Sequence, residues 1–140
     1  MTRRVRPWLG VPVILVLAFV TTSCGGDEGG VGATLADFSI TLDSDSAPAG
    51  EVTFDVTNDA AQTHEFVVIQ TDLAEDQLPT DDSGLVDEEG EGLTLIDEIE
   101  DMAGGSSQSL TVNLDAGSYV LICNLPGHYQ QGMHTSFSAS

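Results

Sequence analysis

Basic residues are almost absent from this sequence. The chain of 140 residues has only three, Arg3, Arg4 and Arg6, while all 23 acidic residues follow them, and the formal net charge is −20. Cleavage after residue 23 would remove every basic residue and no acidic one, which leaves a net charge of −23. Such a charge excludes nucleic acid and anionic membrane surfaces as binding partners. Three interpretations stay open: adaptation to a salty habitat, attraction to a basic partner, and solubility beside an anionic membrane.

Long hydrophobic runs are absent as well. The longest, residues 8–20, has 13 residues, which is short of the roughly 20 that a membrane-spanning helix needs. A short apolar run that follows a cluster of arginines is typical of a secretory signal peptide. We therefore predict a signal peptide over residues 1–23 and a location outside the cytoplasm.

Cysteine is scarce, and its two occurrences have different contexts. Residues 21–24, Thr-Thr-Ser-Cys, resemble a lipobox, the sequence at which bacterial lipoproteins are cleaved and lipidated on the cysteine. We expect a lipid on Cys24, a flexible tether over residues 24–32, and anchoring to the outer face of the cytoplasmic membrane. The alternative is a secreted soluble protein. With Cys24 lipidated, Cys123 would be the only thiol, so no disulfide could form.

The remaining residues, 33–140, are enough for one domain with a single hydrophobic core. Apolar and polar residues alternate along most of this segment, as Val52, Phe54 and Val56 do with their polar neighbours, and this alternation is typical of half-buried strands. We predict strands over residues 36–42, 52–56, 64–69, 93–102, 110–114, 119–123 and 133–139. Short strands with a turn about every ten residues favour an all-β fold, a Greek-key β-sandwich.

One part of this domain, residues 72–101, is strongly acidic, with 13 Asp or Glu among 30 residues. A proline and three glycines interrupt it, so we expect a helical turn at most over residues 72–77 and a surface loop over residues 78–92, an acidic loop insertion. Calcium binding is one interpretation, but neither residues 43–45 nor residues 81–82 continue with the ligand spacing of a calcium loop. A solvated acidic face is the better interpretation.

A thiolate, an imidazole and a thioether lie in one short segment near the C-terminus. Cys123, His128 and Met133 are spaced five residues apart, and His64, the only histidine before them, offers a second imidazole. Taken singly, each residue is ordinarily structural: a buried thiol, a surface imidazole or a core thioether. Taken together, they suit copper in both of its common oxidation states. Zinc is the competing metal, but it favours several thiolates or a closed set of nitrogen and sulfur donors.

The order His64, Cys123, His128, Met133, with its flanking Pro-Gly and Gly-Met steps, resembles the cupredoxins, the superfamily of plastocyanin, azurin and rusticyanin. The resemblance implies one type 1 (blue) copper and electron transfer with a redox partner protein, for which a basic surface is one interpretation. Copper trafficking or sequestration is the alternative. The additional His-x-His clusters of copper oxidases are missing from the sequence, so we expect no enzymatic activity.

The resemblance also implies where electrons enter and leave. In cupredoxins the second histidine, here His128, approaches the surface inside a rim of apolar residues. Leu125 and Pro126 would supply this rim, together with Tyr129. We therefore expect an electron-exit rim formed by Leu125, Pro126 and His128.

Two neighbours of the ligands complete the expectations. Glu65 stands after His64, where better-known cupredoxins often carry Asn or Ser; its N–H could reach the thiolate of Cys123, and its carboxylate should favour Cu(II) and lower the reduction potential. His134 points away from Met133 along the last predicted strand, so we expect it to be exposed.

Overall fold

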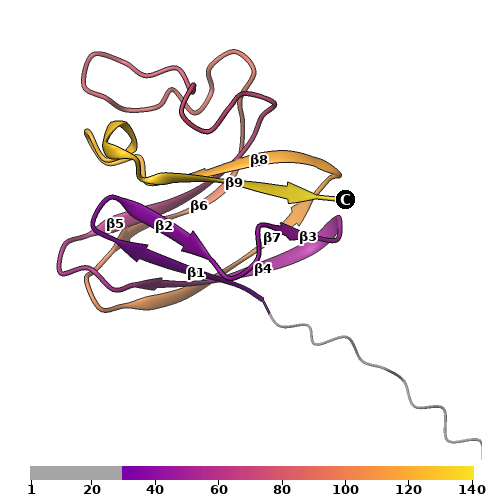
Figure 1. The fold of residues 1–140 in the computed structure, drawn as a ribbon, viewed down its shortest axis with the longest axis horizontal. Coiled ribbons are helices and arrows are strands. Elements are labelled where there is room, and N and C mark those ends of the chain that lie inside the picture. Colours follow the sequence, from indigo (N-terminus) through magenta and orange to yellow (C-terminus); the bar gives the residue numbers. More distant parts are fainter. Residues whose placement is uncertain (1–29) are drawn as a thin grey trace, which may run out of the picture.

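The computed structural model describes residues 30–140 (Figure 1). The predicted signal peptide, Cys24 and nearly all of the predicted tether lie outside this range. The described chain consists of nine strands and one short 3-10 helix: β1(Val31–Ala36), β2(Ser39–Leu42), β3(Ser46–Ala47), β4(Gly50–Asn58), β5(His64–Gln70), β6(Thr94–Met102), β7(Ser107–Leu114), β8(Gly117–Ile122), η1(Tyr129–Gln131) and β9(His134–Ala139). Within residues 30–140, no helix is long and apolar enough to cross a membrane.

The strands form two sheets that pack face to face. Sheet I has the order β2-β1-β4-β7, and sheet II has the order β3-β9-β8-β5-β6. The pairs β1–β4 and β3–β9 are parallel, and the other neighbours are antiparallel. The chain changes sheet five times: before and after β3, between β4 and β5, between β6 and β7, and between β7 and β8. The predicted all-β sandwich is thereby confirmed.

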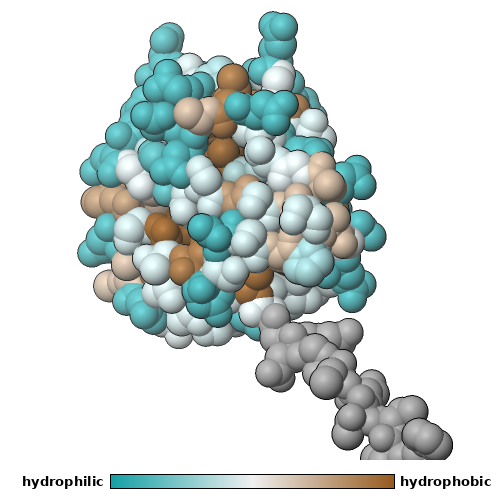
Figure 2. Space-filling model, turned by 45° about the vertical axis from the view of Figure 1, so that its right-hand side comes forward, coloured by the Kyte–Doolittle hydropathy of each residue, from teal (hydrophilic) through white to brown (hydrophobic). Residues whose placement is uncertain are grey.

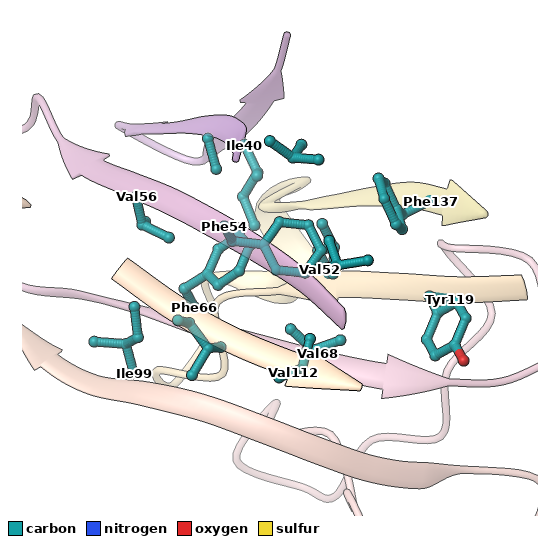
Figure 3. Packing of buried hydrophobic residues seen from close by; sticks show 14 of the residues in the cluster. Ile40, Val52, Phe54, Val56, Phe66, Val68, Ile99, Val112, Tyr119 and Phe137 are labelled. Atoms are coloured by element: carbon teal, nitrogen blue, oxygen red, sulfur yellow. The ribbon is translucent and has the colours of Figure 1, made fainter. Parts of the chain in front are cut away.

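Side chains from both sheets meet in one hydrophobic core (Figure 3). The alternation in β4 places Val52, Phe54 and Val56 inside and their neighbours toward solvent. Phe54 lies at the centre, with its ring centroid 5.4 Å from that of Phe66 in β5 and 5.2 Å from that of Phe137 in β9. Truncation of a buried phenylalanine to alanine costs about 3–5 kcal/mol. This aromatic contact between the sheets is therefore a main source of stability.

The connection between β5 and β6, residues 71–93, lies against the outer side of sheet II, away from sheet I (Figure 1). We call this segment the strap. A second hydrophobic cluster joins it to sheet II: Val67, Ile69, Val120 and Ile122 from the strands, Leu78, Val86 and Leu93 from the strap, and Tyr129. Because β5 and β8 are covered on both sides, their sequences are almost continuously apolar.

The strap is irregular but internally bonded. The predicted helical turn over residues 72–77 is a single turn, in which the Gln77 N–H donates to the Ala74 carbonyl at 2.9 Å. Further along, Thr80 and Val86 form an isolated antiparallel bridge. The strand predicted to follow the loop is confirmed as β6, which begins at Thr94.

The start of the domain differs from the prediction in two ways. The single strand predicted over residues 36–42 is wrong, because the chain turns back after Ala36 and β2 pairs with β1 in antiparallel orientation. At this turn Phe38 has φ of 59°, a left-handed conformation that the uninterrupted alternation of the sequence does not reveal. In addition, β1 begins at Val31, so the last two residues of the predicted tether belong to sheet I.

The outer surface is mainly polar. On the face shown in Figure 2, apolar side chains reach the surface only in small separate groups. Among the described residues, the large apolar side chains with the greatest exposure are Leu73, at 41%, and Leu95, at 36%. On the outer side of sheet I, hydroxyl groups bond across strands, as Thr53 does with Thr111 at 2.8 Å.

Candidate metal centre

Three of the predicted ligands converge at one end of the sandwich. The Nδ1 atoms of His64 and His128 are 3.2 Å apart, and Sγ of Cys123 lies 3.4 Å from Nδ1 of His128 and 3.7 Å from Nδ1 of His64. His64 begins β5, Cys123 follows β8, and His128 lies in the loop before η1. In residues 30–140 this is the one group of three or more His, Cys, Asp or Glu side chains whose ligand atoms all lie within 4.8 Å of one another.

The fourth predicted ligand is held next to Cys123 by backbone hydrogen bonds. The Cys123 N–H donates to the Met133 carbonyl at 3.1 Å, and the Met133 N–H donates to the His128 carbonyl at 3.1 Å. Met133 is completely buried. The loop returns on itself through Gly127 at φ 79° and Gly132 at φ 102°, conformations that glycine adopts without a steric penalty. The Pro-Gly and Gly-Met steps of the sequence thus correspond to the two points at which the loop bends.

His64 is positioned by a residue that the sequence did not single out. The side chain of Asn58, at the end of β4, is fully buried. Its amide donates to the carbonyls of Gln62 and Met102, each at 2.9 Å, and its oxygen accepts from the Ala60 N–H at 3.0 Å. Asn58 thus fixes the connection that leads into His64. The only sequence signal was the Asn-Asp step after a strand, which is typical of a turn.

Glu65 contributes its backbone to the centre and a carboxyl group beside it. Its N–H donates to Sγ of Cys123 at 3.3 Å, as the sequence comparison with cupredoxins suggested. Burial, reinforced by the nearby carboxylates of Glu98, Glu100 and Glu88, raises the pKa of the Glu65 carboxyl to about 7. Glu65 therefore belongs to a cluster of acidic side chains next to the ligand His64.

The protonation states of the three donors fit a metal that takes neutral imidazoles and a thiolate. Burial lowers the pKa of His64, with a further contribution from His128, and burial also lowers the pKa of His128. Both rings are then neutral near pH 7 and can ligate without losing a proton. Burial raises the pKa of Cys123, against the opposing effect of the hydrogen bond from Glu65. Metal binding therefore displaces a proton from Cys123.

Comparison with known protein families decides the assignment. The model of the sulfocyanin (SoxE) domain matches residues 15–140. The chain belongs to the sulfocyanin domain family. No curated protein matches the chain.

Solved structures with the same fold as this sulfocyanin domain include two auracyanins and a rusticyanin. The dithionite-reduced auracyanin of the photosynthetic bacterium Roseiflexus castenholzii is 20% identical with a TM-score of 0.59, and the match covers 78% of this chain and 94% of that chain. Auracyanin A, described as a "blue" copper protein from Chloroflexus aurantiacus, is 23% identical with a TM-score of 0.53, over 80% and 100% of the two chains. Rusticyanin from Thiobacillus ferrooxidans is 19% identical with a TM-score of 0.56, over 79% and 76%.

This sulfocyanin domain is a cupredoxin with a type 1 copper site and a role in electron transfer. The donor set that this site requires is present here: two imidazoles, one thiolate, and the thioether of the loop that follows the thiolate. No other group of side chains among the described residues offers it. His64, Cys123 and His128 would hold the copper, with Met133 beside them. The bound metal supplies one-electron exchange between Cu(I) and Cu(II).

The surroundings of His128 in this sulfocyanin domain differ in part from the predicted rim. Leu125 packs half-buried against the core and Pro126 is exposed. Phe38 also belongs here, because its ring contacts that of His128 edge to face, with centroids 5.3 Å apart. Tyr129 does not, because its side chain is 5% exposed and lies in the cluster under the strap. The inclusion of Tyr129 in the rim is therefore wrong.

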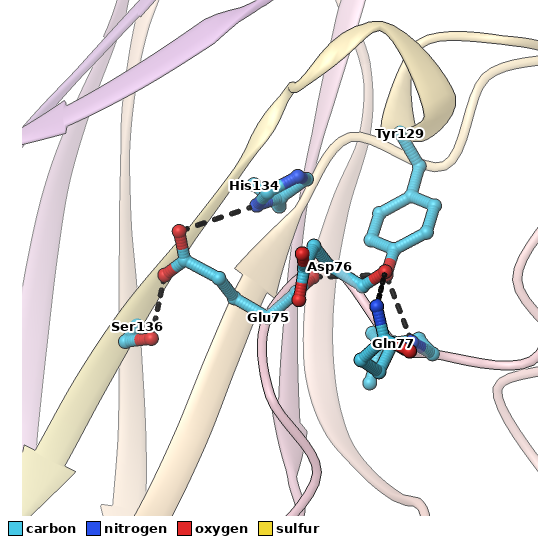
Figure 4. Close-up of polar contacts among 7 residues, drawn as sticks. Glu75, Asp76, Gln77, Tyr129, His134 and Ser136 are labelled. Carbon is cyan, nitrogen blue, oxygen red and sulfur yellow. Dashed lines mark hydrogen bonds and ion pairs between the residues drawn. The ribbon is translucent and has the colours of Figure 1, made fainter.

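His134 is half-buried rather than exposed, which corrects the expectation for this residue. Only 16% of its side chain is accessible, and its Nδ1 lies 3.5 Å from a carboxylate oxygen of Glu75 in the strap (Figure 4). This distance is at the limit of a hydrogen bond, and Nδ1 has no closer partner. The ring also packs against that of Tyr129, with centroids 5.1 Å apart. The strap covers His134, a contact that strand alternation could not predict.

Proposed function

We propose that this protein is an electron carrier that works outside the cytoplasm, anchored to the outer face of the cytoplasmic membrane by a lipid on Cys24, and that it catalyses no reaction of its own. The observation that carries the proposal is the difference in exposure among the ligands. His64, Cys123 and Met133 are completely buried, whereas His128 is only half-buried. His128 is thus the ligand whose side chain a partner protein can contact.

Burial of the other ligands favours a carrier over a copper courier. A courier must release its metal, so at least one of its donors has to move toward the acceptor protein. Here the Cys123 thiol is held by the Glu65 N–H inside a densely packed core, and the loop around Met133 is closed by backbone bonds. Rigid donors change little when an electron is added, which favours rapid electron exchange.

We propose a partner with a basic docking surface. Glu65 directly follows the ligand His64, the carboxylates of Glu88, Glu98 and Glu100 lie near enough to raise its pKa, and the whole chain after Arg6 carries no Lys or Arg. Opposite charge on the partner would steer the encounter and raise its rate at low ionic strength. Nucleic acid would be repelled.

Introducing a charge into the rim should slow electron exchange without disturbing the copper. We expect Leu125→Glu to lower the second-order rate constant with a redox partner about tenfold or more, because a desolvated carboxylate would interrupt the apolar contact. Stopped-flow kinetics would measure this rate. The exposed residue Pro126, changed to Glu, provides a second test, because its side chain does not support the core.

The matched control is Leu73→Glu. Leu73 is 41% exposed and follows the far end of β5, so the same change in charge is made away from His128. This variant should exchange electrons like the wild type. Equal rates for the rim variants and the control, with intact visible spectra, would contradict the proposal that electrons leave through His128.

The courier alternative makes an opposite prediction for the reduced protein. A carrier retains Cu(I) through repeated cycles of oxidation and reduction in the presence of a competing acceptor protein. Quantitative transfer of Cu(I) to that acceptor, combined with slow self-exchange, would contradict the electron-carrier proposal and support copper trafficking.

The anchor is tested separately. We expect mass spectrometry of protein extracted from cell membranes to show an N-terminal lipid on Cys24, and Cys24→Ala to be released or left unprocessed, because no other residue after the apolar run can accept the lipid. A mature terminus at another residue would instead support a secreted soluble protein.

A further inference from the structure

The strap is fastened to the ligand loop by a buried tyrosine. The hydroxyl of Tyr129 accepts a hydrogen bond from the Leu78 N–H at 2.9 Å and donates one to the Glu75 carbonyl at 2.9 Å (Figure 4). Tyr129 directly follows His128 and begins η1, and its carbonyl accepts from the Gly132 N–H at 2.9 Å. One side chain therefore joins the strap to the turn that separates His128 from Met133.

A second fastening lies at the other side of the loop. Asn124 directly follows Cys123, and its side chain bonds the strap in the way that a neighbouring strand would. Its oxygen accepts from the Val86 N–H at 2.7 Å, and its amide donates to the Val86 carbonyl at 3.1 Å and to the Glu88 carboxylate at 2.6 Å. Each fastening residue is thus the immediate chain neighbour of a ligand.

The strap itself is firmly seated. Leu78 and Val86, the residues whose backbone groups take part in the two fastenings, are 5% and 4% exposed and pack in the cluster on sheet II. Both fastenings therefore connect the ligand loop to a part of the molecule that the hydrophobic effect holds in place. A displacement of Tyr129 or Asn124 would move His128 or Cys123 with it.

We propose that Tyr129 and Asn124 are positioning residues for the copper site, and that the strap serves as the frame against which they hold His128, Cys123 and Met133. This role rests on the copper site described above. The simpler alternative is that the strap only shields the apolar outer side of sheet II. The two roles of the strap predict different results in variants. A shield contributes to stability alone, whereas a frame also sets the geometry of the copper ligands.

The test compares variants of Tyr129 and Asn124 with a matched control that also loses a buried hydrogen bond. Tyr129→Phe keeps the ring and removes both hydroxyl bonds, which leaves the buried Leu78 N–H without its partner. Tyr119→Phe is the matched control, because the Tyr119 side chain is 1% exposed and its hydroxyl donates to the Asp115 carbonyl at 2.7 Å, at the end of β8 opposite to Cys123. Asn124→Ala removes the hydrogen bonds of its side chain with Val86 and Glu88.

Measurements on the copper-loaded protein give the first readout. Loss of a group that orients metal ligands typically costs about tenfold in metal affinity. We expect Tyr129→Phe to release copper to a chelator about tenfold faster than wild type, and to shift both the reduction potential and the relative intensities of the visible bands. Asn124→Ala should do the same. Tyr119→Phe should lower the melting temperature but leave the potential and the spectrum unchanged.

Hydrogen exchange on the metal-free protein gives the second readout, which needs no copper. The amides of Cys123 and Met133 close the ligand loop in the structure, and their exchange should accelerate in Tyr129→Phe but not in Tyr119→Phe. Normal protection of these amides, or a copper site indistinguishable from that of the control, would overturn the positioning role. A wild-type protein without the thiolate-to-copper band would instead refute the copper assignment itself.

Discussion

Replacing Cys123 with serine should abolish the intense visible absorption of the copper-loaded protein. This absorption arises from charge transfer between a thiolate and Cu(II), and Cys123 is the only cysteine among residues 30–140. A serine hydroxyl has nearly the same shape but is a much weaker donor, and its proton is not lost near neutral pH. Because of this similar shape, the fold should tolerate the change even though the side chain is fully buried. Visible absorption after addition of one equivalent of Cu(II) measures the effect.

Met133→Ala is the control for this experiment. We expect it to retain the strong band and to alter the reduction potential, because a thioether is a weak axial ligand whereas the thiolate dominates the electronic structure. If the Cys123→Ser protein kept full colour, the copper would have to be bound elsewhere, and the assignment of His64 and His128 would fall with it.

The melting temperature should rise strongly with ionic strength. After Arg6 the chain has no Lys or Arg, so its carboxylates repel one another with almost nothing to offset them. Within residues 30–140 the one close pair of opposite charges joins His134 to Glu75 at 3.5 Å, and it requires a protonated ring. Salt shortens the range of this repulsion to about 10 Å at 0.1 M. Each kcal/mol gained raises the melting temperature by roughly 4–8 °C in a domain of this size. Calorimetry between low and molar sodium chloride measures the slope.

In the metal-free protein, protonation of carboxyl groups at lower pH should also reduce this repulsion. The pKa of Glu65 is raised to about 7 and that of Glu98 is raised as well, in both cases by burial first and by neighbouring carboxylates second. The folded state therefore binds more protons than the unfolded state, and stability falls as the pH rises from the unfolded value of Glu toward 7. Lowering the pH from 8 to 6 at low salt should stabilise the wild-type protein relative to Glu65→Gln, because the lowered pKa values of His64 and His128 oppose the gain equally in both proteins. A response that is flat in both salt and pH would show that repulsion among the carboxylates is unimportant.

The ligands and most strands were predictable because their signals are local. Cys123, His128 and Met133 lie within one loop of fixed spacing, and only His64 had to be found elsewhere. Alternation in β4 and β7 identified the buried side of each strand because sheet I faces solvent on its outer side. In β5 and β8 the alternation is lost, since the strap covers the outer side of sheet II.

What escaped prediction depends on contacts between distant segments. The left-handed turn at Phe38 is compatible with an uninterrupted pattern of alternation, so residues 36–42 resembled one strand. Tyr129 was assigned to the rim because it follows His128, but its hydroxyl bonds the strap 51 residues away. The sequence does not show that Asn58 and Asn124 are structurally important, because each bonds a backbone group that lies far away along the chain.

The arrangement of β1 has a consequence for how the protein would face its surroundings. Val31 starts β1 at one end of the sandwich, and after Ala36 the chain turns at Phe38, whose ring contacts His128 at the other end (Figure 1). A six-residue strand spans about 20 Å. A protein held by Cys24 would therefore carry its electron-transfer edge on the side that points away from the lipid. Partners that arrive from the aqueous phase could then reach this edge directly, whereas a cofactor close to the bilayer surface would be served only when the domain turned over on its predicted flexible tether.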